Sequence, residues 1–285
     1  MAGLLSGLGD LGLGNLENVD IFADPEKKTE QKSVADAPKI TIQEKDLVYD
    51  KSFVCPVCEK KFTNKIVKTG KARLLGMDQD LRPRHEGIDT QKYDVILCPC
   101  CGYAAITRFF PQVTSIQQKL IREQISQKVH LHAYNGETYS FEEAVERYKL
   151  ALVNAVVKRA KNSEKAYVCL KSAWLLRGYL EKLKEDPKAT SEEKEAAAQM
   201  ENSQMQNAYK GFLEAAQSES FPMCGMDEMT VNYLLAVMAL RFKEFDIASK
   251  MTAKILSSPA ASARIKDKAR DLKDEILQEL KKAAK

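Results

Sequence analysis

The sequence predicts an α+β fold that is mostly α: a small cysteine-bearing β module followed by an antiparallel helical array. Two C-P-x-C pairs lie among short strand-like pieces between residues 47 and 110. From residue 111 onward, apolar residues recur every three or four positions, which is typical of the buried face of a helix. We therefore expect a disordered acidic tail at 1–46, the β module at 47–110 and the helical domain at 111–285.

Composition places the chain among ordinary folded proteins. It has 285 residues, 44% of them hydrophobic, which suits one large domain or two smaller ones. No apolar run is long enough to span a membrane, and the Leu-rich N-terminus lacks the basic start of a signal peptide. The seven cysteines of an unexported chain are expected to be thiols or metal ligands. We expect a cytoplasmic protein.

Charge changes along the chain. Residues 1–50 carry five Lys and ten acidic residues, net −5, whereas 51–140 carry fourteen basic and eight acidic residues, net +6. Residues 141–285 carry twenty-five and twenty-two, net +3. This gradient is too shallow to indicate nucleic-acid binding by itself. The tail combines Gly-Leu repeats with an aperiodic polar stretch, although its apolar residues could instead dock on a partner.

The β module is predicted from β-favouring segments next to the cysteines. The clearest runs from Tyr93 to Leu97 and leads directly into Cys98. A strand that feeds a cysteine turn is typical of a zinc ribbon, so we expect a zinc-ribbon-like module. The insert GMDQDLRPRHEGIDTQ between the cysteine pairs is expected to be a loop between ribbon strands.

Four cysteines, Cys55, Cys58, Cys98 and Cys101, are the predicted ligands of one metal ion. Each pair has the C-x-x-C spacing, with a Pro that presets a turn aiming backbone N–H groups at the sulfurs. Cys100 occupies the variable position of its pair and is left out, because using it would give up the two-residue spacer. Zn²⁺ is the expected ion, and iron in a rubredoxin-like site is the alternative.

Two features depart from the usual ribbon pattern. Glu59 stands in the first turn where Gly102 stands in the second, and thirty-nine residues separate the two pairs. The long gap is tolerable because the entropy of loop closure rises only logarithmically with length. Four thiolates leave no open coordination position, so the site is expected to be structural rather than catalytic. It should contribute on the order of 10 kcal/mol to folding.

Basic residues surround the first cysteine pair. They can offset the negative charge of four thiolates, or they can contact the phosphates of a nucleic acid. The rings of Phe53, Phe62, Tyr93 and Tyr103 could add base stacking, but a zinc ribbon usually buries such rings under the metal. We favour charge compensation and keep phosphate contact as the alternative. These residues are Lys60, Lys61, Lys65, Lys68, Lys71 and Arg73.

The helical domain is predicted as antiparallel helix pairs. The stretch YLLAVMALRFKEFDIASKMTAKILSSP resembles a tetratricopeptide unit, because Ala236, Ala239 and Ala248 stand where two helices must approach closely. The Gly and Trp of the usual pattern are missing and the period is irregular, so we expect a degenerate TPR-like array, with an ordinary helical bundle as the alternative. After a capped start near Thr114, the predicted helices are 141–160, 164–184, about 191–217, about 228–242, 245–256 and 262–284.

No catalytic motif stands out, so we expect a protein that is not an enzyme. The sequence contains no H-E-x-x-H, P-loop or G-x-S-x-G stretch, and the Gly-Leu-Gly run at the N-terminus follows no predicted strand and precedes no βαβ unit, as a dinucleotide-binding G-x-G-x-x-G would. Cys169 lies in an apolar helical stripe and is expected to be a buried thiol. Cys224, in the loop PMCGM, is expected to be accessible.

Three stretches carry a resemblance to a known family: CPVCEKKF, DLRPRHEGIDTQKYDVILCPCCGYAA and AWLLRG. From about residue 47 to its end, the chain resembles an uncharacterised bacterial family, domain-of-unknown-function family 2225. The resemblance implies metal ligands at the same four cysteines and a helical, repeat-like second half. It implies no activity. The Arg82–Pro83 pair could mark a contact loop.

These observations favour a non-enzymatic zinc-binding adaptor whose helical groove holds a protein partner. One alternative is nucleic-acid binding through the basic residues, with an affinity that falls steeply as salt rises. The other is a thiol- or metal-dependent enzyme that uses Cys100 or Cys224.

Overall fold

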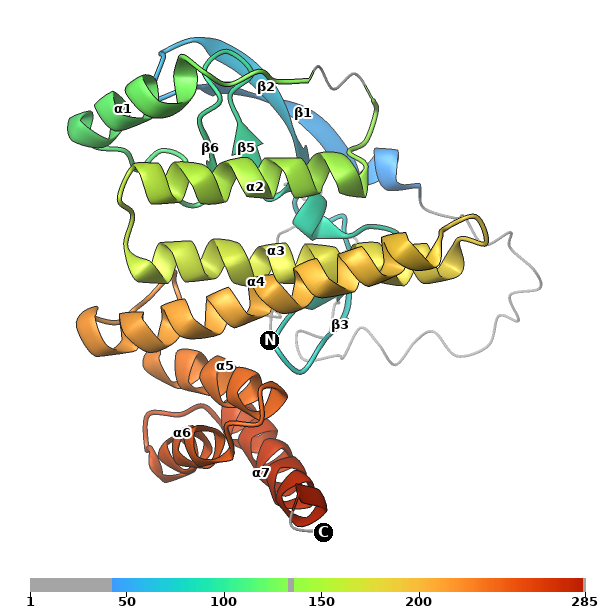
Figure 1. Cartoon of the computed structure of the whole chain (residues 1–285), viewed down its shortest axis with the longest axis vertical. Helices are drawn as coiled ribbons and strands as arrows, with labels where there is room; N and C mark the ends of the chain where they lie inside the picture. Colours follow the sequence, from blue (N-terminus) through green and yellow to red (C-terminus); the bar gives the residue numbers. More distant parts are fainter. Residues whose placement is uncertain (1–42, 133–135, 284–285) are drawn as a thin grey trace, which may run out of the picture. The chain divides into compact units, whose positions relative to one another are not determined.

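The computed structural model describes residues 43–132 and 136–283 (Figure 1). The expected tail at 1–46 lies almost entirely outside the described residues. Within them, short strands around the cysteines come first and seven α-helices follow, which confirms the mostly α, α+β class. The helices are α1 (Ser115–Ile121), α2 (Phe141–Val157), α3 (Asn162–Glu185), α4 (Ser191–Ser218), α5 (Glu228–Arg241), α6 (Phe245–Ser257) and α7 (Ala263–Ala283).

The strands form separate two-stranded antiparallel hairpins. The first and third hairpins each carry a cysteine pair in the turn between their strands. The short 3-10 helix η5 (Thr90–Tyr93) occupies the start of the β-favouring segment, so its strand begins only at Val95. The hairpins are β1 (Val48–Val54) with β2 (Lys61–Val67), β3 (Leu74–Met77) with β4 (Pro83–His85), and β5 (Val95–Leu97) with β6 (Ala104–Ile106).

The second hairpin corrects an expectation. The insert between the cysteine pairs was expected to be a loop, yet Gly76 pairs with Arg84 and Met77 with Pro83 across β3 and β4. All four residues of β3 are exposed, so this hairpin has no apolar face that a period-two pattern could reveal. Charged side chains hold it against the helices instead, as described below.

Side-chain caps explain where several helices begin. The predicted capping box at Thr114 and Gln117 is confirmed, and Thr190 and Glu193 form another at the start of α4. The helix predicted at 164–184 begins two residues earlier, because α3 already includes Asn162 and Ser163, and it has no side-chain cap. Ser163 instead donates its hydroxyl to a carboxylate at the C-terminal end of α4.

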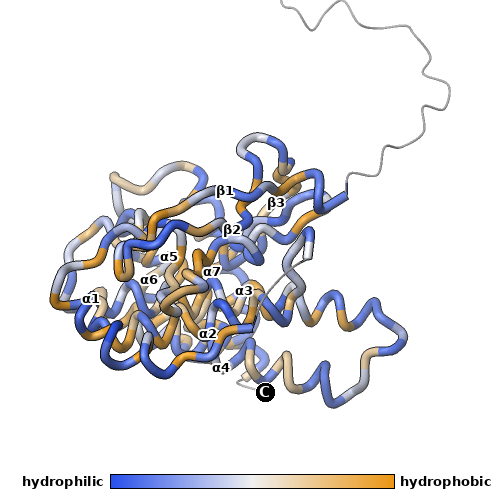
Figure 2. The backbone as a smooth tube through the Cα atoms, turned by 90° about the horizontal axis from the view of Figure 1, so that it is seen from above, coloured by the Kyte–Doolittle hydropathy of each residue, from blue (hydrophilic) through white to orange (hydrophobic). Residues whose placement is uncertain are grey.

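The helices pack as neighbours in sequence. α3 packs along α4, α5 along α6, and α6 along α7. Ala236, Ala239 and Ala248 are fully buried, as expected where α5 and α6 approach closely. Hydrophobic residues gather where α5, α6 and α7 meet (Figure 2). No helix in the described part of the chain is both long and apolar enough to cross a membrane.

The β module and the helices share a core. Val95 and Ile106, from the third hairpin, pack in one buried cluster with Ala144 and Tyr148 of α2 and Leu175 of α3. α2 contacts both β5 and β6. The second cysteine pair is therefore held by a hairpin that is itself fixed on the helical domain.

Candidate metal centre

The structure brings the four predicted cysteines together. One sulfur from each of Cys55, Cys58, Cys98 and Cys101 lies within 4.8 Å of all the others. The Cys55–Cys101 and Cys58–Cys98 sulfur distances are both 3.6 Å. Tetrahedral coordination with Zn–S bonds of about 2.3 Å requires sulfurs about 3.8 Å apart. This cluster can therefore hold a metal ion with little change in geometry.

The two cysteine turns have the same backbone structure. In the first, Glu59 N–H donates to the carbonyl of Cys55 at 2.8 Å; in the second, Gly102 N–H donates to the carbonyl of Cys98 at 3.0 Å. Glu59 has φ +61° and Gly102 has φ +71°. Glu59 differs from the Gly of the usual pattern, yet it is held in the conformation that Gly adopts freely, at a cost of about 1–2 kcal/mol. The backbone N–H of Val57 also points at the Cys55 sulfur, 3.4 Å away.

Aromatic rings shield the cluster. Phe62 and Tyr103 are buried with the cysteines, and both rings pack against Phe110. The Tyr103 hydroxyl donates to the Phe110 carbonyl at 3.0 Å, which satisfies its only polar group. Tyr93 is also buried and donates to Glu44. Rings in these positions support the module and do not offer the open faces that base stacking requires.

Contacts among the sulfurs shift the pKa values of two of the thiols in opposite directions. Hydrogen bonds from Cys101 and Cys98 lower the pKa of the Cys55 thiol to about 4, although burial opposes this change. The same contact raises the pKa of the Cys101 thiol, which keeps the shared proton. Metal ions bind thiolates and release such protons, so the donor set has the chemistry of a thiolate metal site.

The segment after the third hairpin covers the cysteine turns, a role that was not predicted from the sequence. Arg122 lies in the short π-helix η6 (Arg122–Ser126) that follows α1, and its Nε donates to the Val57 carbonyl at 2.8 Å. A Cβ on Gly102 would lie only 2.7 Å from the Cγ1 atom of Val129, so this valine packs directly against the Gly102 backbone. The capped start near Thr114 and the apolar periodicity from residue 111 predicted a helix in this segment, but they did not indicate where the helix would pack.

The other cysteines lie in different environments. Cys100 is exposed beside the cluster. Cys169 is buried as expected, and burial raises its pKa to about 11. Cys224 is only half-buried, but its sulfur donates to the Ser163 carbonyl at 3.2 Å and burial raises its pKa to about 12. A thiol with so high a pKa is a poor nucleophile at neutral pH.

Several of the basic residues are already occupied. Lys65 pairs with Asp50 at 3.1 Å, and Lys68 donates to the backbone carbonyl of Asp46. Arg73 lies 3.8 Å from a carboxylate oxygen of Glu86, the residue that follows β4. Lys60, Lys61 and Lys71 are exposed. Phosphate contact through these side chains stays a prediction.

Two of the motifs noted in the sequence meet in space. Arg177, at the end of AWLLR on α3, pairs with Asp80 of the β3–β4 turn at 2.7 Å. Arg82, in the same turn, pairs with Asp89 at 2.9 Å and with Glu181 of α3 at 3.1 Å. The Arg82–Pro83 pair is therefore a contact loop within the chain, and its partner is α3.

Gly178 makes this contact possible. A Cβ at this position would lie 2.2 Å from the Asp89 carboxylate and 2.7 Å from the Arg82 guanidinium. Only glycine lets the ion pair lie directly on the helix backbone at that point. In the sequence, AWLLRG stands out only as part of the family resemblance, and nothing in it indicates that its last two residues hold the β3–β4 turn.

The fold and the site define a class of protein in which a β module with a four-cysteine cluster is joined to a helical array. The chain belongs to the family DUF2225, described as an uncharacterized protein conserved in bacteria, whose model matches residues 48–276. Searches of curated proteins and of solved structures found no match.

Proposed function

We propose that this protein is a non-enzymatic adaptor in which a structural zinc ion fixes the β module and a TPR-like helical surface binds another protein. The observation that carries the proposal is the closed four-cysteine cluster. Four thiolates complete the tetrahedral coordination of Zn²⁺ and leave no position for a water or a substrate. All four donors are sulfur, which suits Zn²⁺ better than Mg²⁺, Ca²⁺ or Mn²⁺.

The helical half supports the second part of the proposal. A groove of about 610 Å³ lies between α6 and α7, lined by Ala253, Leu256, Leu277 and neighbouring residues. Leu277 is 45% exposed there. Exposed apolar side chains in a groove between helices are typical of a surface that receives a helix or an extended segment of a partner.

Proximity labelling in cells tests this proposal, with the labelling enzyme fused to the full chain. A Leu277→Arg substitution places a charge in the groove, and because Leu277 is exposed the fold should tolerate it. Val153→Arg is the matched control, since Val153 is 50% exposed on α2, outside the groove. We expect one or a few proteins to be labelled strongly by the wild type and the control and weakly by the groove variant.

Purified candidate partners then decide the outcome. Direct binding that Leu277→Arg weakens and Val153→Arg does not would support the adaptor function. Binding that both variants retain, or turnover of a small molecule that requires one of the cluster thiols, would contradict it.

A further inference from the structure

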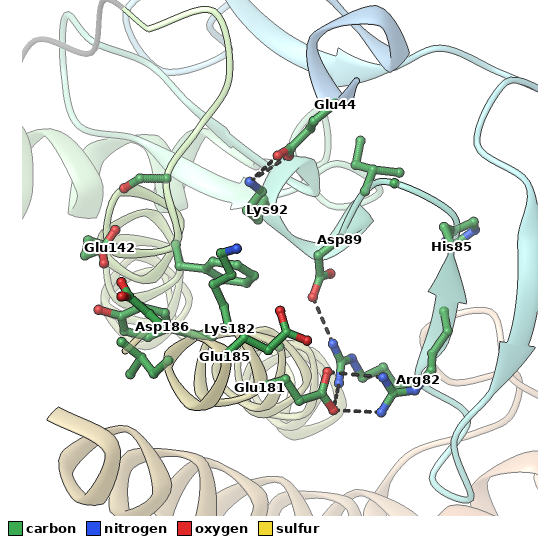
Figure 3. A pocket seen from close by; sticks show the side chains of 18 of the residues that line it. Glu44, Arg82, His85, Asp89, Lys92, Glu142, Glu181, Lys182, Glu185 and Asp186 are labelled. Atoms are coloured by element: carbon green, nitrogen blue, oxygen red, sulfur yellow. Dashed lines mark hydrogen bonds and ion pairs between the residues drawn. The ribbon is translucent and has the colours of Figure 1, made fainter. Parts of the chain in front are cut away.

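A cavity of about 750 Å³ lies where the β3–β4 hairpin meets the ends of two helices. Its walls come from the 3-10 helix η4 (Glu44–Leu47), the segment from Arg82 to Lys92, the start of α2 and the last turns of α3 (Figure 3). The volume lies within the range of small-molecule sites. None of the four cysteines lines this cavity.

The lining carries more negative than positive charge. Six acidic residues and four Lys or Arg residues face the cavity, a difference of two negative charges. His85 adds none at neutral pH, because burial lowers its pKa below the ordinary 6.5. The acidic residues are Glu44, Asp89, Glu142, Glu181, Glu185 and Asp186, and the basic ones are Arg82, Arg84, Lys92 and Lys182.

Ion pairs divide this lining into two halves. Arg82, Arg84 and Lys92 are all paired with carboxylates of the hairpin side or of Glu181. On the other side, Glu142, Glu185 and Asp186 form no salt bridge with any described residue, and neither does Lys182, the basic residue that lines this side. The charge of Lys92 reaches Glu142 only through space. The unbalanced charge therefore belongs to the helix ends.

One ammonium group already shows how the cavity binds a cation. Lys92, whose side chain is 7% exposed, lies 2.6 Å from the Glu44 carboxylate and 5.1 Å from the centre of the Phe141 ring. A carboxylate and an aromatic face together replace the water that an ammonium loses on burial. The cavity wall is thus built to hold this chemical group.

The same two groups recur next to this site, and the second carboxylate has no salt bridge to a described residue. The ring of Tyr179 stacks on Phe141, with centroids 5.5 Å apart and an angle of 20° between the planes. Its hydroxyl is hydrogen-bonded to the Glu142 carboxylate. Tyr179 and Glu142 therefore present a second ring and carboxylate, with Glu185 and Asp186 on the same side of the cavity.

We propose that this cavity binds an organic cation bearing an ammonium or guanidinium group, held between the Tyr179 ring and the carboxylates of Glu142, Glu185 and Asp186. The group can belong to a free polyamine or to a Lys or Arg side chain of a peptide. The site does not depend on the adaptor function, because it lies away from the α6–α7 groove.

The lining distinguishes an organic cation from its competitors. An anion would meet the negative excess, and the three cations of the hairpin side are already paired. A divalent metal ion would gain from the carboxylates but not from the rings, since it prefers oxygen ligands. Only an organic cation uses both the charge and the aromatic faces.

Isothermal titration calorimetry with the full chain tests the proposal, using spermidine and the peptide acetyl-Gly-Arg-Gly-amide as probes at near-physiological salt. We expect saturable binding of at least one probe, with one site per chain. Binding of spermidine alone identifies a free polyamine as the source of the group, and binding of the peptide alone identifies a basic side chain. A lack of saturable binding of both probes would overturn the proposal.

Matched charge variants separate the cavity from general attraction. Glu185→Gln with Asp186→Asn removes two charges at the cavity and keeps the side-chain shapes. Asp271→Asn with Asp274→Asn removes two exposed charges from α7, outside the cavity. We expect the cavity pair to weaken binding about tenfold and the α7 pair to change it by less than about twofold. Equal effects of the two pairs would refute a specific site.

Two further variants guard against misfolding and against a metal site. Lys182→Gln removes the basic side chain on the acidic side of the cavity, so it should tighten probe binding, a gain that a damaged fold cannot produce. Tyr179→Leu should weaken probe binding. Mg²⁺ at the same concentration should not displace the probe. Weaker probe binding to Lys182→Gln would contradict the proposal. So would displacement of the probe by Mg²⁺ at the same concentration.

Discussion

Replacing Arg177 with Met removes the cation that fixes the β3–β4 turn on α3. Arg177 lies 2.7 Å from Asp80 and 3.0 Å from Glu201. Glu201 keeps a second partner in Arg241, whereas Asp80 has no other salt bridge within the described residues. The Asp80 side chain is only 6% exposed, so the substitution leaves a carboxylate buried without its cation.

The cost follows from this burial. Removing one partner of a buried ion pair costs about 3–5 kcal/mol, because the remaining charge stays out of water. Arg177 itself is 23% exposed, so water screens part of the interaction. We therefore expect the free energy of unfolding to fall by about 3 kcal/mol. Met retains the packing of the aliphatic stem, so the loss reports mainly on charge.

Urea unfolding followed by tryptophan fluorescence measures this change. Trp174 is the only Trp of the chain and is buried on the same helix as Arg177. Arg270→Met is the control: Arg270 is 63% exposed and pairs with Asp267 on the surface of α7, so it should cost less than about 1 kcal/mol. Asp80→Asn combined with Arg177→Met should recover part of the loss, since no buried charge then remains unpaired.

Equal losses for Arg177→Met and Arg270→Met would refute this reasoning. So would strict additivity of Asp80→Asn and Arg177→Met, because two residues in one buried ion pair must show a coupling energy.

Three further predictions concern the turns and the charged network, all measured by the same urea titration. Gly102→Ala should lower the free energy of unfolding by about 2 kcal/mol, because it combines a φ of +71° with a Cβ 2.7 Å from a valine side chain. Glu59→Gly, at φ +61°, should raise the free energy of unfolding by about 0.5–1 kcal/mol; a stabilising Gly102→Ala or a destabilising Glu59→Gly would contradict the equivalence of the two turns. Gly178→Ala should cost about 3 kcal/mol, because its Cβ would lie 2.2 Å from Asp89, and a neutral effect would show that the turn is not held there. Burial raises the pKa of Glu201, but its two arginine partners outweigh burial and hold the pKa below the ordinary 4.5. Its contribution to stability is therefore complete above pH 4.5 and is lost as the pH falls through the folded-state pKa. Glu201→Gln should flatten the loss of stability in that acidic range, and an unchanged slope would count against the network.

Local signals in the sequence predicted most of the helical part. Apolar residues at steps of three and four placed α2 to α7 within a few residues of their observed bounds, and α5 to α7 follow the predicted segments closely. Capping residues such as Thr114 marked a helix start correctly. These signals depend on neighbours within one helical turn, so the sequence alone carries them.

The four cysteines were also brought together as their spacing indicated, because a C-x-x-C turn is a local structure. What spacing could not indicate is how two turns of different composition adopt one conformation. Glu59 takes a positive φ without being Gly, because the tertiary structure compensates for the strain.

The contacts between the β module and α3 depend on residues far apart in the chain. Asp80 and Arg177 are ninety-seven positions apart, so no local pattern in the sequence links them. The β3–β4 hairpin is held by such ion pairs and not by an apolar face, so it was expected to be a loop. The cavity beside it likewise exists only once the hairpin and the helix ends have packed together.

Native mass spectrometry of the purified full chain measures whether the four cysteines hold a metal ion. We expect one zinc ion per chain, bound through four thiols that resist alkylation while Cys100 reacts. Removing the ion with a chelator should then lower the melting temperature sharply, since a structural site of this kind contributes on the order of 10 kcal/mol. A metal-free chain that melts at the same temperature with and without chelator would rule out a structural zinc site.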